Sequence, residues 1–127
     1  MYCAEATVEG LIGPEFSSWN SLVEWLNAVI IDDRVLERFS NVPPDIQIGR
    51  RSRSATASLA SVARSAILIR DGSRTPLTAL HELAHLIAPG VPPHGPRFRE
   101  TVCELARITC GIEASTELRA AYRAQGL

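Results

Sequence analysis

HELAHLIAPGVPPHGPRF, residues 81–98, contains all three histidines of a 127-residue chain. Thr75-Pro76 just upstream predicts a helix start, because a capping hydroxyl precedes a proline at the first helical position. Pro89-Gly90 predicts the end of that helix near Ala88. The helix between these signals is apolar nearly all round, which indicates that it lies in the protein interior.

Two histidines and a glutamate in this helix form the pattern His-Glu-x-x-His. His81 and His85 are one turn apart, so their imidazoles face the same way and can converge on one ion. Glu82 is rotated by about 100° from His81 and lies beside the pair. A catalytic zinc ion keeps one position open for a water molecule, whose pKa it lowers to about 7. The pattern therefore predicts a zinc site, with Glu82 as the general base that takes the proton from the zinc-bound water.

A third protein ligand is needed, because catalytic zinc sites use three. We expect His94, since the proline-broken turn after the helix can fold the chain back towards His81 and His85. Glu100 and Glu104 are the rivals, four residues apart on the next predicted helix. Both fit a solvated helix face better, and Glu104 is kept as the reserve ligand.

Two motifs, HELAH at residues 81–85 and HGPRF at residues 94–98, carry a resemblance to a known family. They resemble the SprT-like zincin metallopeptidases, and still more the small bacterial and phage metallohydrolases that share HExxH followed by HGPxF. The resemblance is sharp over residues 75–105. It implies that the three histidines are the zinc ligands, that Glu82 is the general base, and that Phe98 packs to fix the turn of the third histidine.

The chain also departs from that family. It lacks the metzincin spacing, with glycine and histidine soon after HExxH. It also lacks the Cys-x-x-Cys zinc ribbon that often follows the SprT-like domain, which weakens any inference of DNA-linked proteolysis. Because the family label itself depends largely on the motif, the resemblance identifies no substrate.

The other elements are predicted from apolar spacing and turn residues. Ser17 or Ser18 caps the first helix, and Asp32 or Asp33 caps the second. The segment 55–63 is ambiguous, although its threonine, serine and valine permit a strand. The predicted elements are helices over 19–30 and 33–39, strands around 46–48 and 66–69, the helix from 76 to about 88, a helix from 96 that Gly111 stops, and a last helix around 118–122.

The order of helices, then strands, then helices predicts an α+β fold in one domain, residues 1–127. The resemblance adds that the fold is zincin-like. N-terminal helices and a small, mostly antiparallel sheet then precede the HExxH helix, and two C-terminal helices follow it.

Composition argues against a membrane protein and favours a cytoplasmic one. Hydrophobic residues make up 46% and charged residues 21% of the chain, and no apolar run approaches the ~20 residues of a membrane span. The opening MYCAEATVEG lacks the basic start and apolar stretch of a signal peptide. Cys3, Cys103 and Cys110 form no Cys-x-x-Cys, and the last two lie about 10 Å apart on one predicted helix, so we expect no disulfide between them.

The favoured function is a zinc-dependent hydrolase of the metallopeptidase type that acts on a peptide or protein substrate. Zincins lay an extended substrate along an edge strand, for which the segments 55–63 and 66–70 are the candidates. Tyr122 and Arg97 are candidates for stabilising the transition state, although each is more often structural.

Two alternatives stay open. The first is a non-catalytic, zinc-stabilised module that binds a protein or nucleic acid through residues 46–74, where six arginines accompany one acid, Asp71. This alternative predicts a closed site with four ligands. The second is a regulatory HExxH protease that acts on a repressor. Its third ligand is typically a downstream glutamate, so His94 counts against it.

Overall fold

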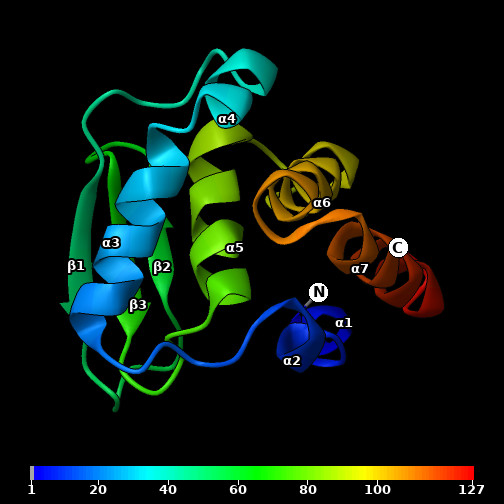
Figure 1. Ribbon diagram of the computed structural model, residues 1–127, viewed down its shortest axis with the longest axis horizontal. Coiled ribbons are helices and arrows are strands. Elements are labelled where there is room, and N and C mark those ends of the chain that lie inside the picture. The colour runs from blue at the N-terminus through cyan, green and yellow to red at the C-terminus, as the bar shows by residue number, and fades with distance from the viewer. Residues whose placement is uncertain (1) are drawn as a thin grey trace.

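A computed structural model describes residues 2–127, apart from the side chains of Tyr2, Cys3 and Leu11. Along the chain, a block of helices is followed by a block of strands and then by a second block of helices (Figure 1). In chain order the elements are α1 (Tyr2–Ala6), α2 (Glu9–Ile12), α3 (Trp19–Ile30), α4 (Asp33–Arg38), β1 (Gln47–Arg51), β2 (Leu59–Ser61), β3 (Ala66–Arg70), α5 (Pro76–Ile87), α6 (Pro96–Cys110) and α7 (Ile112–Ala124). The predicted α+β class is confirmed.

The predicted caps and stops are found at α3, α4, α5 and α6, whereas the sequence does not predict α1 and α2, and α7 is longer than predicted. Ser18, Asp32 and Thr75 each accept a hydrogen bond from a backbone N–H in the first turn of α3, α4 and α5, respectively. Pro76 occupies the first position of α5, where its missing N–H costs no hydrogen bond. Gly111 ends α6 with a φ of 101°, a conformation that glycine adopts without strain.

The three strands form one mixed sheet in the order β1-β3-β2. β1 pairs in parallel with β3 over five residues, whereas β2 pairs antiparallel with β3 over three. The expectation of a mostly antiparallel sheet is therefore wrong.

The burial of β3 explains this strand order. Ile67 and Ile69 on β3 are fully buried, so the most apolar strand takes the central position. The short β2 precedes it and turns back into it at Val62–Ser65, where the Ser65 amide donates to the Val62 carbonyl. β1 pairs with the other side of β3 and runs parallel to it. Residues 66–70 are consequently no sheet edge, and β2 is one.

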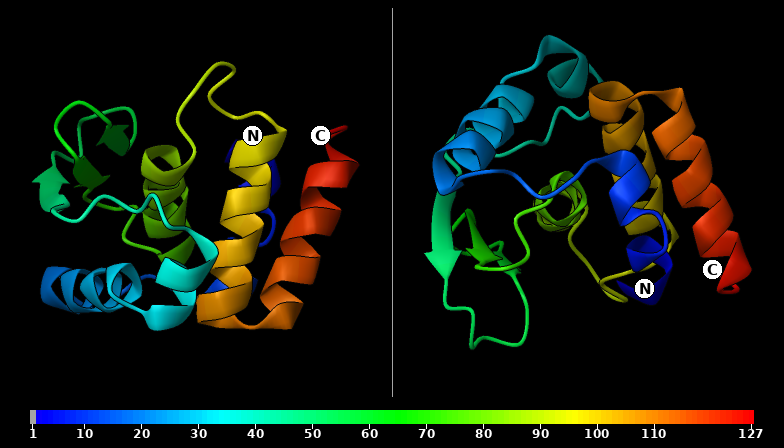
Figure 2. Two further views of the ribbon diagram at one scale, coloured as in Figure 1. Left: turned by 90° about the horizontal axis from the view of Figure 1, so that it is seen from above. Right: turned by 60° about the horizontal axis from the view of Figure 1, so that its bottom comes forward.

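α5 lies between the sheet and the other C-terminal helices (Figure 1). It packs against β2 and β3 on one side, and against α6 and the N-terminal α2 on the other. The right view of Figure 2 looks nearly along α5 and shows it enclosed in this way. α1 packs against α7, so the first and last helices of the chain are in contact.

The core is built around α5. Ten of its twelve residues are buried, which confirms the interior position that its sequence predicts. Apolar side chains of α3, β3, α6 and α7 join it in one continuous cluster. Among the residues described, no helix is long and apolar enough to cross a membrane. Cys103 and Cys110 are free thiols on α6, as expected, and the side chain of Cys3 lies outside the described part.

Candidate metal centre

The three histidines converge beside the second half of α5. His81 and His85 project from α5, and His94 comes from the turn between α5 and α6. One nitrogen of each lies within 4.8 Å of the others, and the Nε2 atoms of His85 and His94 are 3.1 Å apart. Two nitrogens bound to one tetrahedral zinc ion at ~2.0–2.1 Å are separated by about 3.3 Å. The donor set therefore fits a zinc ion held by three imidazoles, and the His85–His94 pair already has nearly the spacing of two zinc ligands.

The turn after α5 places His94 as the sequence predicts. Gly90 has a φ of 142°, and α6 begins at Pro96, immediately after Gly95. A Cβ atom on Gly95 would lie 3.2 Å from the Cγ atom of Pro92, so the backbone passes close to that proline. The Arg99 guanidinium donates to the His94 carbonyl at 2.7 Å and holds the turn against α6. These contacts direct the His94 ring towards α5.

The Phe98 side chain packs against all three imidazoles. Its ring is stacked on that of His85, with the centroids 4.4 Å apart and the planes at 29°. The centroids of His81 and His94 lie 4.9 and 5.0 Å from it. Phe98 is 2% exposed, so it covers one side of the histidine cluster with a buried apolar ring. Phe98 thus packs against His94 as expected, and it also packs against His81 and His85.

Glu82 lies next to the cluster and is not part of it. The side chain is only 2% exposed, and none of the described residues forms a hydrogen bond or ion pair with its carboxylate. Burial raises the pKa of Glu82 from 4.5 to about 7; the charge of His81 opposes the rise and that of Glu5 adds to it. A carboxyl group with a pKa near neutrality can both accept and return a proton.

Two of the histidines are held in their neutral form. Burial, reinforced by the charges of His81 and His94, lowers the pKa of His85 from 6.5 to about 4. The pKa of His94 is also lowered, first by burial and then by His81, with Glu5 opposing. Because only a neutral imidazole has a lone pair to give to a metal, both rings are ready to bind one at neutral pH.

Glu5 is a site residue that the sequence does not reveal. It lies on α1 and is 5% exposed, and its carboxylate oxygens are 2.7 and 2.9 Å from Nδ1 of His81. The Tyr122 hydroxyl of α7 donates to the same carboxylate at 2.9 Å. Nothing in the opening segment distinguishes Glu5 from a surface acid, because its partners are 76 and 117 residues away in sequence.

The other candidate residues lie elsewhere. Tyr122 is occupied with Glu5, and burial followed by the Glu5 charge raises the pKa of its hydroxyl. Arg97 is exposed and lines a separate hollow with Arg38 and Glu100, so neither Tyr122 nor Arg97 faces the metal cluster as a transition-state stabiliser.

The rival ligands pair with arginines and not with the histidines. Both oxygens of Glu100 accept from Arg119, at 2.6 and 2.9 Å. Glu104 accepts from Arg107 at 2.9 Å and forms an ion pair with Arg119 at 3.5 Å. The group of side chains in the described part that could hold a metal ion contains His94 and neither glutamate.

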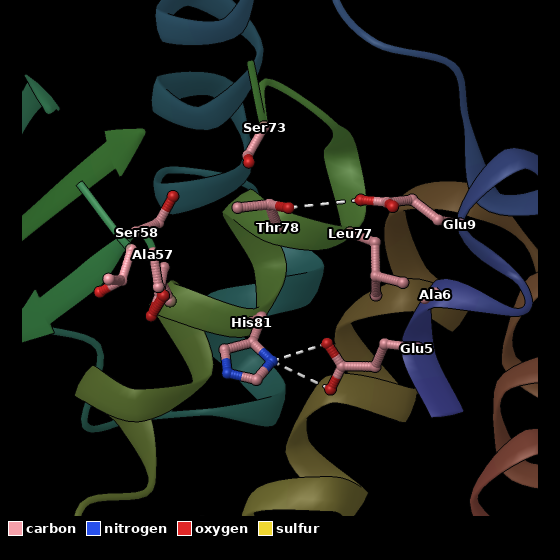
Figure 3. A pocket seen from close by; sticks show the side chains of 11 residues that line it. Glu5, Ala6, Glu9, Ala57, Ser58, Ser73, Leu77, Thr78 and His81 are labelled. Atoms are coloured by element: carbon pink, nitrogen blue, oxygen red, sulfur yellow. Dashed lines mark hydrogen bonds and ion pairs between the residues drawn. The ribbon is translucent and has the colours of Figure 1, made fainter. Parts of the chain in front are cut away.

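Two pockets meet at Glu82. One, of about 410 Å³, is lined by Glu82 together with His81, Ser58 and Thr78. Figure 3 labels the last three of these residues. The other, of about 360 Å³, is lined by Glu82, the other two histidines, and the β2 residues Leu59 and Ala60. Ser58 and Glu82 line both pockets, so the two pockets adjoin each other. They lie beside the candidate centre, next to β2.

No protein-family model, curated protein or solved structure matches the chain. The resemblance to the SprT-like zincins therefore stays a prediction.

Proposed function

We propose that this chain is a zinc-dependent hydrolase of the metallopeptidase type, with His81, His85 and His94 as ligands and Glu82 as the general base. The observation that carries the proposal is the position of Glu82. It is a buried carboxylate beside three convergent imidazoles, it has a pKa near neutrality, and it borders both pockets. A carboxylate of purely structural use is costly in such a place, because no described residue forms a hydrogen bond or ion pair that offsets its burial.

Zinc, when bound, supplies Lewis-acid chemistry, since it polarises a substrate carbonyl and makes water more acidic. The chain's own residues would do the remainder. Three protein ligands leave one coordination position open, as catalytic zinc sites require. Glu82 would take the proton of the attacking water and return it to the leaving amine. Phe98 and the apolar side chains of α5 exclude bulk water from one side of the cluster.

A peptide in extended conformation is the proposed substrate class. β2 is an edge strand, and its residues Leu59 and Ala60 line the pocket that contains His85 and His94. An extended peptide can hydrogen-bond to such an edge through its backbone and pass in front of Glu82. In this binding mode most contacts are made to the backbone of the peptide, so we propose that the site accepts substrates of varied sequence. Of the two candidate strands, only the 55–63 segment supplies an edge.

The alternatives have less support from the geometry. A closed structural zinc site needs a fourth ligand, and no other histidine, cysteine or acid of the described part joins the three histidines. Within the arginine-rich segment, Arg51 and Arg70 donate to carbonyls of the loop before β2, and Arg50 pairs with Asp71. These arginines thus support their own loop more than a nucleic-acid surface. A repressor-directed protease with a glutamate ligand is disfavoured by the arginine partners of Glu104.

The direct test combines metal content with cleavage of a mixed peptide library. Purified protein supplied with zinc is expected to retain one equivalent after desalting, measured by elemental analysis. Mass spectrometry of the library is expected to show new internal cleavage products that a chelator abolishes and added zinc restores. Less than half an equivalent of any transition metal after zinc supplementation would show that the proposed centre does not bind metal. Full metal content with an uncleaved library would argue against peptidase activity.

A further inference from the structure

The carboxylate of Glu5 joins three segments that are distant in sequence. It lies on α1, accepts a hydrogen bond from Tyr122 on α7, and contacts Nδ1 of His81 on α5. All three side chains are buried, with exposed fractions of 5%, 4% and 1% for Glu5, Tyr122 and His81. Glu5 is not one of the convergent metal-binding groups, so its position needs an explanation of its own.

The contact favours one nitrogen of His81 for metal binding. The Glu5 carboxylate accepts from the Tyr122 hydroxyl, and if it also accepts from Nδ1 of His81, the hydrogen of the ring is on Nδ1. The lone pair then resides on Nε2. Figure 3 shows the Glu5 carboxylate approaching the imidazole on its Nδ1 side, which leaves Nε2 on the other side of the ring. Tyr122 holds the carboxylate in this orientation, because its hydroxyl donates to Oε2 at 2.9 Å.

The contact also makes the metal centre depend on α1. This helix has five residues, and so short a helix is not stable alone in water. Its position comes from packing: Ala4 is fully buried, and α1 contacts α7. When α1 is displaced, His81 loses the partner that fixes its tautomer and ring orientation.

We propose that Glu5, oriented by Tyr122, is a positioning residue that fixes His81 for metal binding through Nε2 and thereby couples metal affinity to the packing of α1. The inference depends on the proposed zinc site and adds to it a residue that is not a ligand. Coupling is reciprocal: if packing of α1 strengthens zinc binding, zinc strengthens the packing of α1 by the same factor.

Zinc affinity by chelator competition tests the first part, with Glu5→Gln, Tyr122→Phe and the matched control Glu9→Gln. Glu9 lies on the next helix and accepts hydrogen bonds from the hydroxyls of Thr75 and Thr78, away from the imidazoles. Glu5→Gln is expected to weaken zinc binding by about 10–100-fold, the usual effect of losing an outer-shell partner. Tyr122→Phe is expected to weaken it less, and Glu9→Gln to leave it unchanged.

Two further readouts separate positioning from general stability. In the protein loaded with Co²⁺, Glu5→Gln is expected to change the visible absorption bands, because the geometry of the histidine ligand changes. In hydrogen exchange, zinc is expected to protect the amides of α1 in the unaltered chain and in Glu9→Gln, but much less in Glu5→Gln. Should Glu5→Gln fail to fold, Tyr122→Phe carries the same three measurements.

The outcomes distinguish this inference from the proposed function. Tight zinc binding by the unaltered chain, with equal affinity, spectrum and α1 protection in Glu5→Gln and Tyr122→Phe, overturns the positioning role and leaves the metal centre standing. Failure of the unaltered chain to bind zinc overturns the proposed function, and the inference with it. Equal weakening in Glu5→Gln and Glu9→Gln also overturns the inference, since the effect then comes from the N-terminal segment in general.

Discussion

At the scale of single residues, Glu82 decides whether this site is catalytic. We expect Glu82→Gln to keep the fold and the zinc but to lower peptide hydrolysis by about 10²–10⁴-fold, the usual contribution of a general base. Glutamine has nearly the same shape and cannot accept the proton. Elemental analysis and library cleavage measured on the same sample provide the check. Loss of zinc from the variant would make Glu82 a ligand, and an unchanged rate would remove it from the mechanism.

The lowered pKa values of His85 and His94 lead to a prediction for the pH dependence of the proposed metal binding. Protons compete with zinc for an imidazole, and a ring with a lower pKa stays neutral to a lower pH. Since the pKa of His85 is lowered from 6.5 to about 4 and that of His94 is also lowered, both rings stay neutral, and so able to bind a metal, below pH 6.5. We therefore expect zinc affinity to change little from pH 7.5 to 6.5 and to fall steeply only at lower pH. A chelator titration at each pH measures this, and a midpoint of zinc loss at or above pH 6.5 would contradict it.

At the scale of elements, the cap of α5 ties the active helix to the N-terminal helices. The Thr75 hydroxyl accepts from the Thr78 amide and donates to the carboxylate of Glu9 on α2. We expect Thr75→Ala to lower the free energy of unfolding by about 0.5–2 kcal/mol, the range for loss of an N-cap side chain. Urea denaturation measures it, with Thr75→Ser as the control that keeps the hydroxyl. Equal losses in the two variants would assign the effect to the lost methyl group.

The elements that the sequence predicts are those determined by local chemistry. The start of α5 is determined by Thr75 and Pro76, and the end of α6 by Gly111. Each acts over only a few residues, so its effect can be predicted without knowledge of the fold. The parallel pairing of β1 with β3 has no such local signal. It depends on which strand takes the centre of the sheet, and burial of Ile67 and Ile69 settles that only when α5 packs against β3.

At the scale of the whole molecule, the part of the site that local spacing determines is predicted, and the part that tertiary packing determines is not. His81, Glu82 and His85 share one helix, and the turn to His94 is only nine residues long, so spacing alone brings these residues together. Glu5 and Tyr122 reach the site from opposite ends of the chain, 117 residues apart. Only the packing of α1 against α7 creates their contact, and no periodicity in the sequence encodes it.

The packing of α6 between α5 and α7 also separates His94, the proposed third ligand, from its rival Glu104. His94 lies at the α5 end of this arrangement, with Nε2 3.1 Å from that of His85, whereas Glu104 is paired with Arg107 and with Arg119 of α7. We expect His94→Ala to weaken zinc binding by more than the ~10–100-fold that loss of an outer-shell partner costs. Glu104→Ala should leave zinc affinity unchanged and lower the free energy of unfolding, because the half-buried Glu104 carboxylate pairs with both Arg107 and Arg119. Chelator competition and thermal unfolding on both variants measure this. Zinc release by Glu104→Ala together with zinc retention by His94→Ala would make the centre one of two histidines and a glutamate, and α6 would then have to turn its Glu104 face towards α5.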